Sequence, residues 1–358
     1  MRLFLSADIV GSTALKQSPR SIAKASSEWF PVIQGFYLET QREFSKAWEA
    51  AEREDQSRTP WGPKPELWKV IGDEIVFAKH LTDNRQLACT LSVWLKAVNM
   101  ARAFVKTIDP RLDVKCTAWT AGFPVMNKEV VVATSATADI SELVNYYKDS
   151  GRILERRYSG DNIDGFTVDY VGPSIDIGFR LATQATARKF VVSVGVAYIL
   201  SMTNRPAHDH NRLPALHYAG ATPLKGVFGG ASYPIFWLDM AKEGELERLE
   251  DKLLVPRTTT NDDIHKFCAQ FFSVTSAYTF PPFIFSETEA QITVWPNDYE
   301  EKLAALAENY AFEVLPDKES EAEAEKQSSP ADEAGQPDPK VAISEIVSLA
   351  GSRSGDEA

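Results

Sequence analysis

Residues 4–13 read FLSADIVGST. The apolar run from Arg2 to Asp8 predicts a short strand, and Gly11-Ser12-Thr13 after it predicts a turn whose hydroxyls cap a helix. The strand therefore delivers the carboxylate of Asp8 to a glycine-containing turn. Backbone N–H groups of residues 9–13 would be available there to phosphate oxygens.

A second carboxylate lies at the tip of a predicted hairpin. Residues 66–71 and 75–80 are extended and apolar-rich, and they flank Gly72-Asp73-Glu74, which predicts an exposed acidic turn. If this hairpin lies beside the first strand, Asp8 and Asp73 reach one point at the edge of a sheet. Two hard oxygen ligands there suit Mg²⁺ or Mn²⁺, with substrate phosphates completing the shell. The alternative is that Asp73 is an ordinary turn residue and Asp8 a cap.

Helices and strands alternate along the first two-thirds of the chain. The predicted elements are a helix from residue 22 to 48, bent near Pro31, a helix over 87–105, a strand over 114–123, a helix starting at Gly172-Pro173, and strands over 190–194 and 231–238. This order predicts an α+β sandwich with helices on a largely antiparallel sheet.

The chain divides into three predicted parts. Residues 1–240 form the main domain, which carries Asp8 and Asp73, and residues 241–316 form an accessory helical and aromatic segment. Residues 317–358 contain 11 acidic and four basic residues and almost no aromatic ones, which predicts a disordered acidic tail.

Composition excludes several classes of protein. No apolar run of 18 residues is present and no secretory signal precedes Asp8, which predicts a soluble, cytoplasmic protein. The net charge of −12 is not that of a protein that binds duplex DNA or an anionic membrane. Cys89, Cys116 and Cys268 lie far apart, which predicts buried, reduced thiols and neither disulfides nor a zinc site.

Four segments together resemble a known family. Residues 4–13 and Lys69-Val70-Ile71-Gly72-Asp73-Glu74 resemble the two metal-binding segments of class III nucleotidyl cyclases. Residues 169–180, DYVGPSIDIGFR, resemble a third segment of that family, and Leu224-Lys225-Gly226 a fourth. The segments occur in family order over about residues 1–240. The resemblance implies the ferredoxin-like, palm-type sandwich of these cyclases.

The resemblance also implies a mechanism. Class III cyclases are head-to-tail dimers with an active site at each interface, where two divalent metals polarise the α-phosphate and lower the pKa of the ribose 3′-OH. The implied roles in this chain are metal binding by Asp8, Ile9 and Asp73, phosphate binding by Gly11, Ser12 and Thr13, base binding by the partner's Lys69 and Asp169, and ribose and phosphate contacts by the partner's Asp176 and Arg180.

The choice of base stays open from hydrogen-bonding groups alone. Lys69 donates and Asp169 accepts, which fits adenine, uracil or cytosine. The opening segment, and Asp176 where the family usually has Asn, resemble the pyrimidine cyclases of Pycsar antiphage systems, so UTP is the first choice and CTP the second. A separate effector protein would sense the product. Trp68 would either shrink the base pocket or lie in the core.

Other interpretations remain. The chain could be an adenylate cyclase that makes cyclic AMP, or a degenerate cyclase-like binding module. Gly72-Asp73-Glu74 also resembles the diguanylate-cyclase signature, although Ile71 replaces a glycine. Arg180 could form only a surface ion pair with Asp176, worth about 0.3–0.5 kcal/mol. His208-Asp209-His210 is a weaker metal candidate, because no further ligands are apparent.

Overall fold

The computed structural model describes residues 1–18, 29–54, 61–134, 146–202, 213–240, 249, 260–284 and 298–312. In chain order the elements are β1 (Arg2–Val10), α1 (Ser12–Lys16), α3 (Trp29–Glu54), β2 (Glu66–Ile71), β3 (Glu74–His80), α4 (Arg85–Ile108), β4 (Asp113–Ala121), β5 (Lys128–Ala133), α5 (Tyr146–Tyr158), β6 (Phe166–Val171), α6 (Pro173–Leu181), β7 (Lys189–Val192), α7 (Val194–Met202), β8 (Leu216–Pro223), the 3-10 turn η3 (Phe228–Gly230), β9 (Ser232–Asp239), α9 (Asn261–Val274) and α10 (Tyr299–Phe312).

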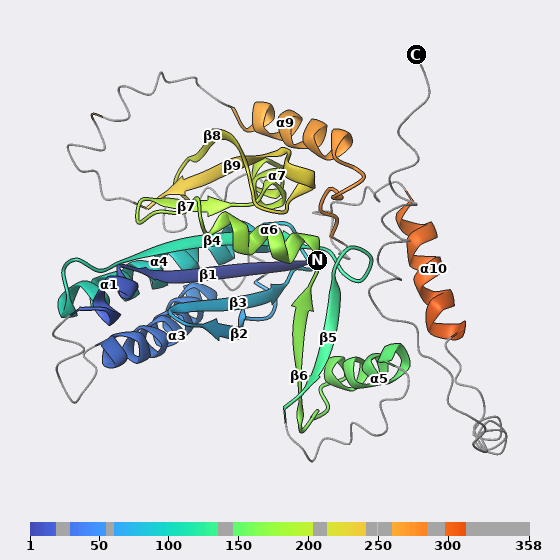
Figure 1. Ribbon diagram of the computed structural model, residues 1–358, viewed down its shortest axis with the longest axis horizontal. Coiled ribbons are helices and arrows are strands. Elements are labelled where there is room, and N and C mark those ends of the chain that lie inside the picture. The colour runs from blue at the N-terminus through green and yellow to red at the C-terminus, as the bar shows by residue number, and fades with distance from the viewer. Residues whose placement is uncertain are drawn as a thin grey trace, which may run out of the picture. The chain divides into compact units, whose positions relative to one another are not determined.

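Seven strands form one sheet in the order β2-β3-β1-β4-β7-β9-β8 (Figure 1). Neighbouring strands are antiparallel, except that β4 and β7 are parallel. A parallel pair needs a long crossover, and the chain between β4 and β7 supplies one that contains β5, α5, β6 and α6. The predicted α+β fold with a largely antiparallel sheet is confirmed, with this one pair as the exception.

β1 lies inside the sheet, with β3 paired along one side and β4 along the other. Successive side chains of a strand point to opposite faces. Leu3 and Leu5 belong to the main core cluster, which they share with α3 and α4, whereas Phe4 belongs to a second cluster. Asp8 has the same parity as Phe4, so it lies on the face opposite α3 and α4.

α3 and α4 pack against each other and against the sheet. The predicted apolar stripe of α3 is confirmed, because Phe36, Phe44 and Trp48 are buried. The described helix runs unbroken from Trp29 to Glu54, and the predicted bend near Pro31 stays a prediction. Pro31 lies in its first described turn, where a missing N–H disturbs a helix least.

α6 lies against β4 on the other face of the sheet. Its predicted start is confirmed, with Gly172 as N-cap and Pro173 as the first helical residue. Gly178 rests directly on the Trp119 ring, and a Cβ at this position would lie 2.2 Å from the indole. A glycine is therefore required for α6 to approach β4 this closely.

β5, β6 and α5 form an arm beside the main sheet (Figure 1). Arg2 of β1 holds this arm: its Nε donates to Glu129 Oε1 at 2.8 Å, and its Nη2 donates to the Tyr158 hydroxyl at 2.7 Å.

The sequence left the pairing of residues 124–170 unassigned, and it did not predict α5, α7 or β8. α7 is apolar on all sides and buried, so it lacks the amphipathic period that reveals a surface helix.

The segment after β9 contributes two described helices. α9 places Cys268 and Phe272 in the main core, and Tyr299 of α10 packs on Phe283 with ring centroids 4.6 Å apart. The boundaries at residues 240 and 316 remain predictions. The predicted disordered tail and His208-Asp209-His210 lie outside the described residues.

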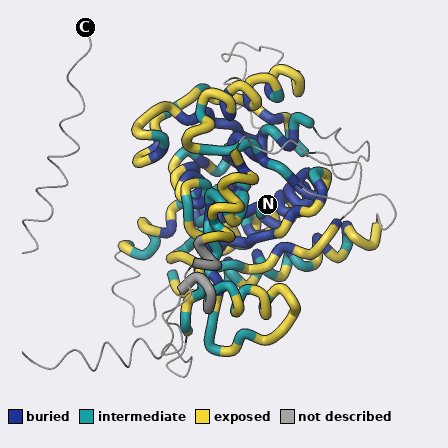
Figure 2. The backbone as a smooth tube through the Cα atoms, turned by 90° about the vertical axis from the view of Figure 1, so that its right-hand side faces the viewer, coloured by how far each residue is buried: buried dark blue, intermediate teal, exposed yellow. Residues whose placement is uncertain are grey.

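Burial is concentrated in the sheet and on the helix sides that face it (Figure 2). Cys89, Cys116 and Cys268 are buried and form no disulfide, as predicted. In the part of the chain that the structure describes, no helix has both the length and the apolar composition to cross a membrane.

Lys79 of β3 is a buried cation on the α3 side of the sheet, 2% exposed. Its ammonium donates to Trp61 O at 2.8 Å and to Pro63 O, and it lies 4.5 Å from the ring centroid of Trp48. Burial lowers the pKa of Lys79 from 10.5 to about 7. This side chain holds the residues that enter β2 against the end of α3.

Lys79 should make stability depend on pH. Because its pKa in the folded protein lies below its pKa in the unfolded chain, the unfolded chain binds more protons between pH 7 and 10.5, so the free energy of unfolding rises with pH in that window. The slope from one group is at most about 1.4 kcal/mol per pH unit. Denaturant unfolding at pH 7, 8 and 9 should show a smaller rise for Lys79→Met than for the wild type. The exposed Lys225→Met is the control, and equal slopes in all three proteins would contradict the prediction.

Candidate functional site

Three charged side chains lie in one row across the sheet. Asp8 of β1 is directly opposite Lys115 of β4 on one side and Glu74 of β3 on the other. All three share the face that carries Phe4, away from α3 and α4. Lys115 Nζ lies 3.0 Å from Asp8 Oδ2.

The β2–β3 turn brings Asp73 to this row. Gly72 adopts φ 66°, a left-handed conformation that a tight two-residue turn requires and that glycine adopts without strain. Tyr37 of α3 donates to Gly72 O, and Ile9 N donates to Asp73 O at 3.4 Å. The structure therefore brings Asp8 and Asp73 to the same edge of the sheet, where the Asp73 carboxylate helps to raise the pKa of Asp8.

The carboxylates are partly enclosed rather than exposed, unlike the turn predicted from the sequence. Burial raises the pKa of Asp8, Lys115 opposes this rise, and the Asp73 carboxylate adds to it. Burial also raises the pKa of Glu74; the Ser6 hydroxyl donates to this carboxylate and opposes the rise, while Asp8 adds to it. Like charges held this close favour a proton or a cation between them.

The turn after β1 differs in one respect from the prediction. Gly11, at φ 91°, precedes α1 as its N-cap, and no side chain caps this helix. Ser12 instead donates to Asp73 Oδ2, and Lys16 Nζ lies 3.2 Å from Asp73 Oδ1. Because α1 begins beside the β2–β3 turn, the Ser12 hydroxyl donates to the Asp73 carboxylate and does not cap the helix. Thr13 lies in the first turn of α1 and is exposed.

Lys69 and Asp169 form a second site on this face. Lys69 of β2 and Asp169 of β6 are far apart in the sequence, yet Lys69 Nζ lies 2.6 Å from Asp169 Oδ1. Lys69 lies within β2, whereas Asp73 lies in the turn that follows the end of this strand at Ile71. The residues predicted to bind the base and those predicted to bind the metal therefore occupy different places in one chain.

Asp176 and Arg180 lie exposed on α6. They are one helical turn apart, but among the described residues no ion pair joins them. The surface ion pair considered from the sequence is not formed. The Arg180 guanidinium is left pointing to solvent, available to another molecule.

Sequence reasoning did not find five residues around the carboxylates, namely Ser6, Lys16, Tyr37, Glu74 as a neighbour of Asp8, and Lys115. Lys115 is found only from the register of β1 and β4. Lys16 carries a weak signal, since it lies one helical turn after Ser12.

Asp8 and Asp73 were tested as a metal site. Among the described residues, no group of three or more His, Cys, Asp or Glu side chains is arranged to hold a metal ion by itself. Mg²⁺ is commonly bound by one or two carboxylates with water and substrate phosphates, and these two neighbouring carboxylates fit that donor set. Lys115 and Lys16 now supply the neutralising charge.

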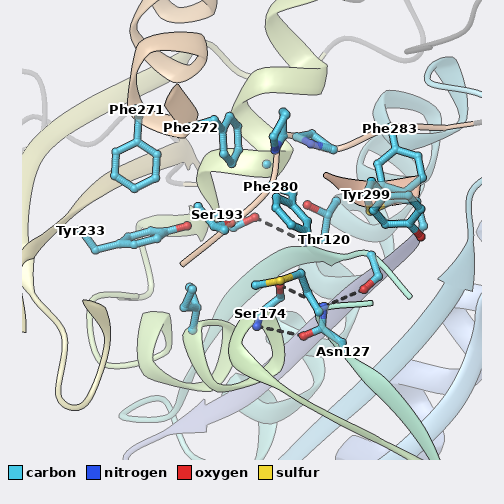
Figure 3. A pocket seen from close by; sticks show the side chains of 18 residues that line it. Thr120, Asn127, Ser174, Ser193, Tyr233, Phe271, Phe272, Phe280, Phe283 and Tyr299 are labelled. Atoms are coloured by element: carbon cyan, nitrogen blue, oxygen red, sulfur yellow. Dashed lines mark hydrogen bonds between the residues drawn. The ribbon is translucent and has the colours of Figure 1, made fainter. Parts of the chain in front are cut away.

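A separate cavity of about 50 Å³ is lined by none of the predicted site residues (Figure 3). Asn127 at its edge is fully buried, and its side chain bonds Gly122 O and both the N–H and the hydroxyl of Ser174. A volume of this size admits only a few water molecules. We assign no ligand to it.

The chain was compared with known proteins. No family model matches it, and no curated protein matches it in sequence. The structure is similar to the adenylyl cyclase CyaB from P. aeruginosa, at 11% identity and a TM-score of 0.40 over 68% of this chain and 95% of that chain. It is also similar to the guanylate cyclase domain of RhGC from Catenaria anguillulae in complex with GTP, at 10% identity and a TM-score of 0.36 over 66% of this chain and 94% of that chain. These likenesses are too distant to assign an activity.

In the metal-free protein, the Lys115 ammonium should supply the positive charge that a metal ion would otherwise supply beside Asp8. Lys115→Met leaves Asp8 beside two carboxylates, so it should lower the free energy of unfolding of the metal-free protein by about 1–2 kcal/mol, a value discounted for partial exposure. Mn²⁺ should then raise the melting temperature of this variant more than that of the wild type. Lys106→Met is the control, because its ammonium pairs with Asp113 at 2.6 Å elsewhere. An identical Mn²⁺ response in all three proteins would reject a cation site at Asp8.

Proposed function

We propose that this chain is a class III nucleotidyl cyclase that converts a pyrimidine nucleoside triphosphate to its 3′,5′-cyclic monophosphate and pyrophosphate. UTP is the favoured substrate and CTP the second, and the product serves as a second messenger in antiphage defence, read by a separate effector. The observation that carries the proposal is the placement of Asp8 beside the β2–β3 turn that carries Asp73, where Ile9 N donates to Asp73 O, although the two carboxylates are 65 positions apart in the sequence.

Asp8 and Asp73, with the backbone of Ile9, would hold two Mg²⁺ or Mn²⁺ ions. When bound, such ions neutralise charge on the triphosphate and lower the pKa of the ribose 3′-OH. Lys16 and Lys115 already lie on these carboxylates, at 3.2 and 3.0 Å. Both ammonium groups would stay close enough to offset the charge of the bound phosphates.

The backbone at the start of α1 would bind the phosphates. The first N–H groups of a helix have no partner within it and attract anions. Gly11, Ser12 and Thr13 place these groups directly after Asp8. Because α1 has only five residues, this contribution is local and depends on the adjacent ions.

A dimer explains why the two sites of one chain lie apart. Lys69 pairs with Asp169, whereas Asp73 lies in the turn after β2 beside Lys16. As the family resemblance implies, one nucleotide would meet Asp8 and Asp73 of one subunit and the Lys69–Asp169 pair of the other. Arg180 of that second subunit would stabilise charge on the transferring phosphate, since a guanidinium offers several fixed donors. Asp176 would accept from a ribose hydroxyl.

The pyrimidine assignment is supported by the sequence resemblance alone. Lys69 donates and Asp169 accepts, which suits the N3–H and a carbonyl of uracil, and equally the edges of cytosine or adenine. The competing function is an adenylate cyclase. Incubating the purified protein separately with each of the four nucleoside triphosphates and Mn²⁺, and identifying products by mass, separates these functions. If no nucleotide gives a cyclic product, both cyclase functions are rejected and the degenerate cyclase-like binding module is the remaining interpretation.

Asp73→Asn should abolish activity without unfolding the protein. Loss of a metal-binding carboxylate should reduce kcat by about 1,000-fold or more, since several kcal/mol of charge stabilisation are removed. The melting temperature should stay within about 3 °C, because a partly exposed turn residue contributes little to stability and its charge opposes that of Asp8. Asp161→Asn, an exposed turn carboxylate outside the site, is the control. A fully active Asp73→Asn variant would reject the metal assignment.

Composite sites predict complementation between two inactive variants. In a mixture of Asp73→Asn and Arg180→Ala subunits, half of the dimers are mixed, and each mixed dimer has one intact site of two. About a quarter of the wild-type activity should return. Native mass spectrometry should measure the mixed dimers, and their presence without activity would overturn the shared-site arrangement.

A further inference from the structure

β2 contains a bulge at Trp68. Leu67 pairs with Phe77 and Lys69 pairs with Val76, so two steps along β2 match one step along β3. Without a bulge, Trp68 and Lys69 would point to opposite faces of the sheet. The extra residue puts both on the face of Val76, where Asp169 lies.

The Trp68 indole is held in place by other rings. Phe4 and Tyr170 lie with their ring centroids 5.1 Å from it, both edge to face, and Phe179 lies at 6.0 Å. Such contacts favour one orientation of the ring. The side chain is therefore half-buried against this cluster, and its N–H has a fixed direction.

Both members of the base-binding pair touch this one indole. Trp68 Nε1 donates to Asp169 Oδ1 at 3.0 Å, and Lys69 Nζ lies 4.0 Å from the centroid of the Trp68 ring. The ring face attracts the ammonium, and the ring edge holds the carboxylate. Trp68 thus fixes the cation and the anion at once.

The hydrogen bonds on Asp169 are unequal. Oδ1 receives Trp68 Nε1 at 3.0 Å, Tyr170 N at 2.9 Å and Lys69 Nζ at 2.6 Å. Among the described residues, no donor is recorded on Oδ2. Oδ1 therefore already accepts from three donors, and Oδ2 is left to accept from a ligand that binds beside Lys69.

We propose that Trp68 is a positioning residue that sets the nucleobase preference of the Lys69–Asp169 pair; this rests on the proposed function. With Oδ1 saturated, the pair offers one acceptor beside one cationic donor. It therefore matches a base edge with one N–H next to one acceptor, as uracil, cytosine and adenine present. Guanine presents two neighbouring N–H groups beside its carbonyl, and one of them is left without a partner.

Trp68→Phe tests this role, because phenylalanine keeps a ring in the aromatic cluster and removes the N–H. In steady-state assays with all four nucleotides, KM for the preferred nucleotide should rise about tenfold while kcat changes less than about threefold. The ratio of kcat/KM for the preferred nucleotide to that for GTP should fall by at least as much. Trp237→Phe, the same change on β9, should leave KM and the ratio unaltered.

A second measurement does not need activity. In protein labelled with 5-fluorotryptophan, the Trp68 resonance is the one of eight that Trp68→Phe removes. Asp169→Asn should shift that resonance, and Trp237→Phe should not. An unshifted resonance, or an unchanged nucleotide ratio in an active Trp68→Phe enzyme, overturns the inference. A wild type that is inactive with every nucleotide refutes the proposed function instead, and the resonance then decides the Trp68–Asp169 contact.

Discussion

The pairing of β1 with β3 and β4 at once is the constraint on which the rest of the structure depends. Its register sets Glu74, Asp8 and Lys115 side by side, and its alternation buries Leu3 and Leu5 while turning Asp8 to the opposite face. A slip of one residue would send Asp8 into the core and Ala7 to the surface. Burial of the apolar side chains of β1 therefore fixes the face on which Asp8 lies.

Holding carboxylates together opposes folding, and the surroundings show how this is offset. Asp8, Asp73 and Glu74 are balanced by two ammonium groups and two hydroxyls, which come from β1, α1 and β4. A site optimised for stability alone would place apolar residues here. Retaining acidic residues in a partly enclosed position is typical of functional sites, where stability is given up for binding or catalysis.

Much of the fold could be predicted from local patterns, and the site only in part. The strand before Asp8, the Gly72-Asp73 turn, α4 and the start of α6 follow from periodicity, turn chemistry and Pro173. α7 and β8 could not be predicted, because one is apolar throughout and the other has little alternation. Lys115 and the bulge at Trp68 depend on strand register, which is a tertiary property that no single segment encodes.

Arg2 gives β1 a mechanical role. At one end of the strand this guanidinium grips the arm that carries Asp169, and at the other end Asp8 begins the acidic row. The six residue steps from Arg2 to Asp8 span about 20 Å of hydrogen-bonded backbone. The arm that carries Asp169 and the row that contains Asp8 are thus held by opposite ends of one strand, so their separation within a subunit is set by backbone geometry and is insensitive to changes in the intervening loops.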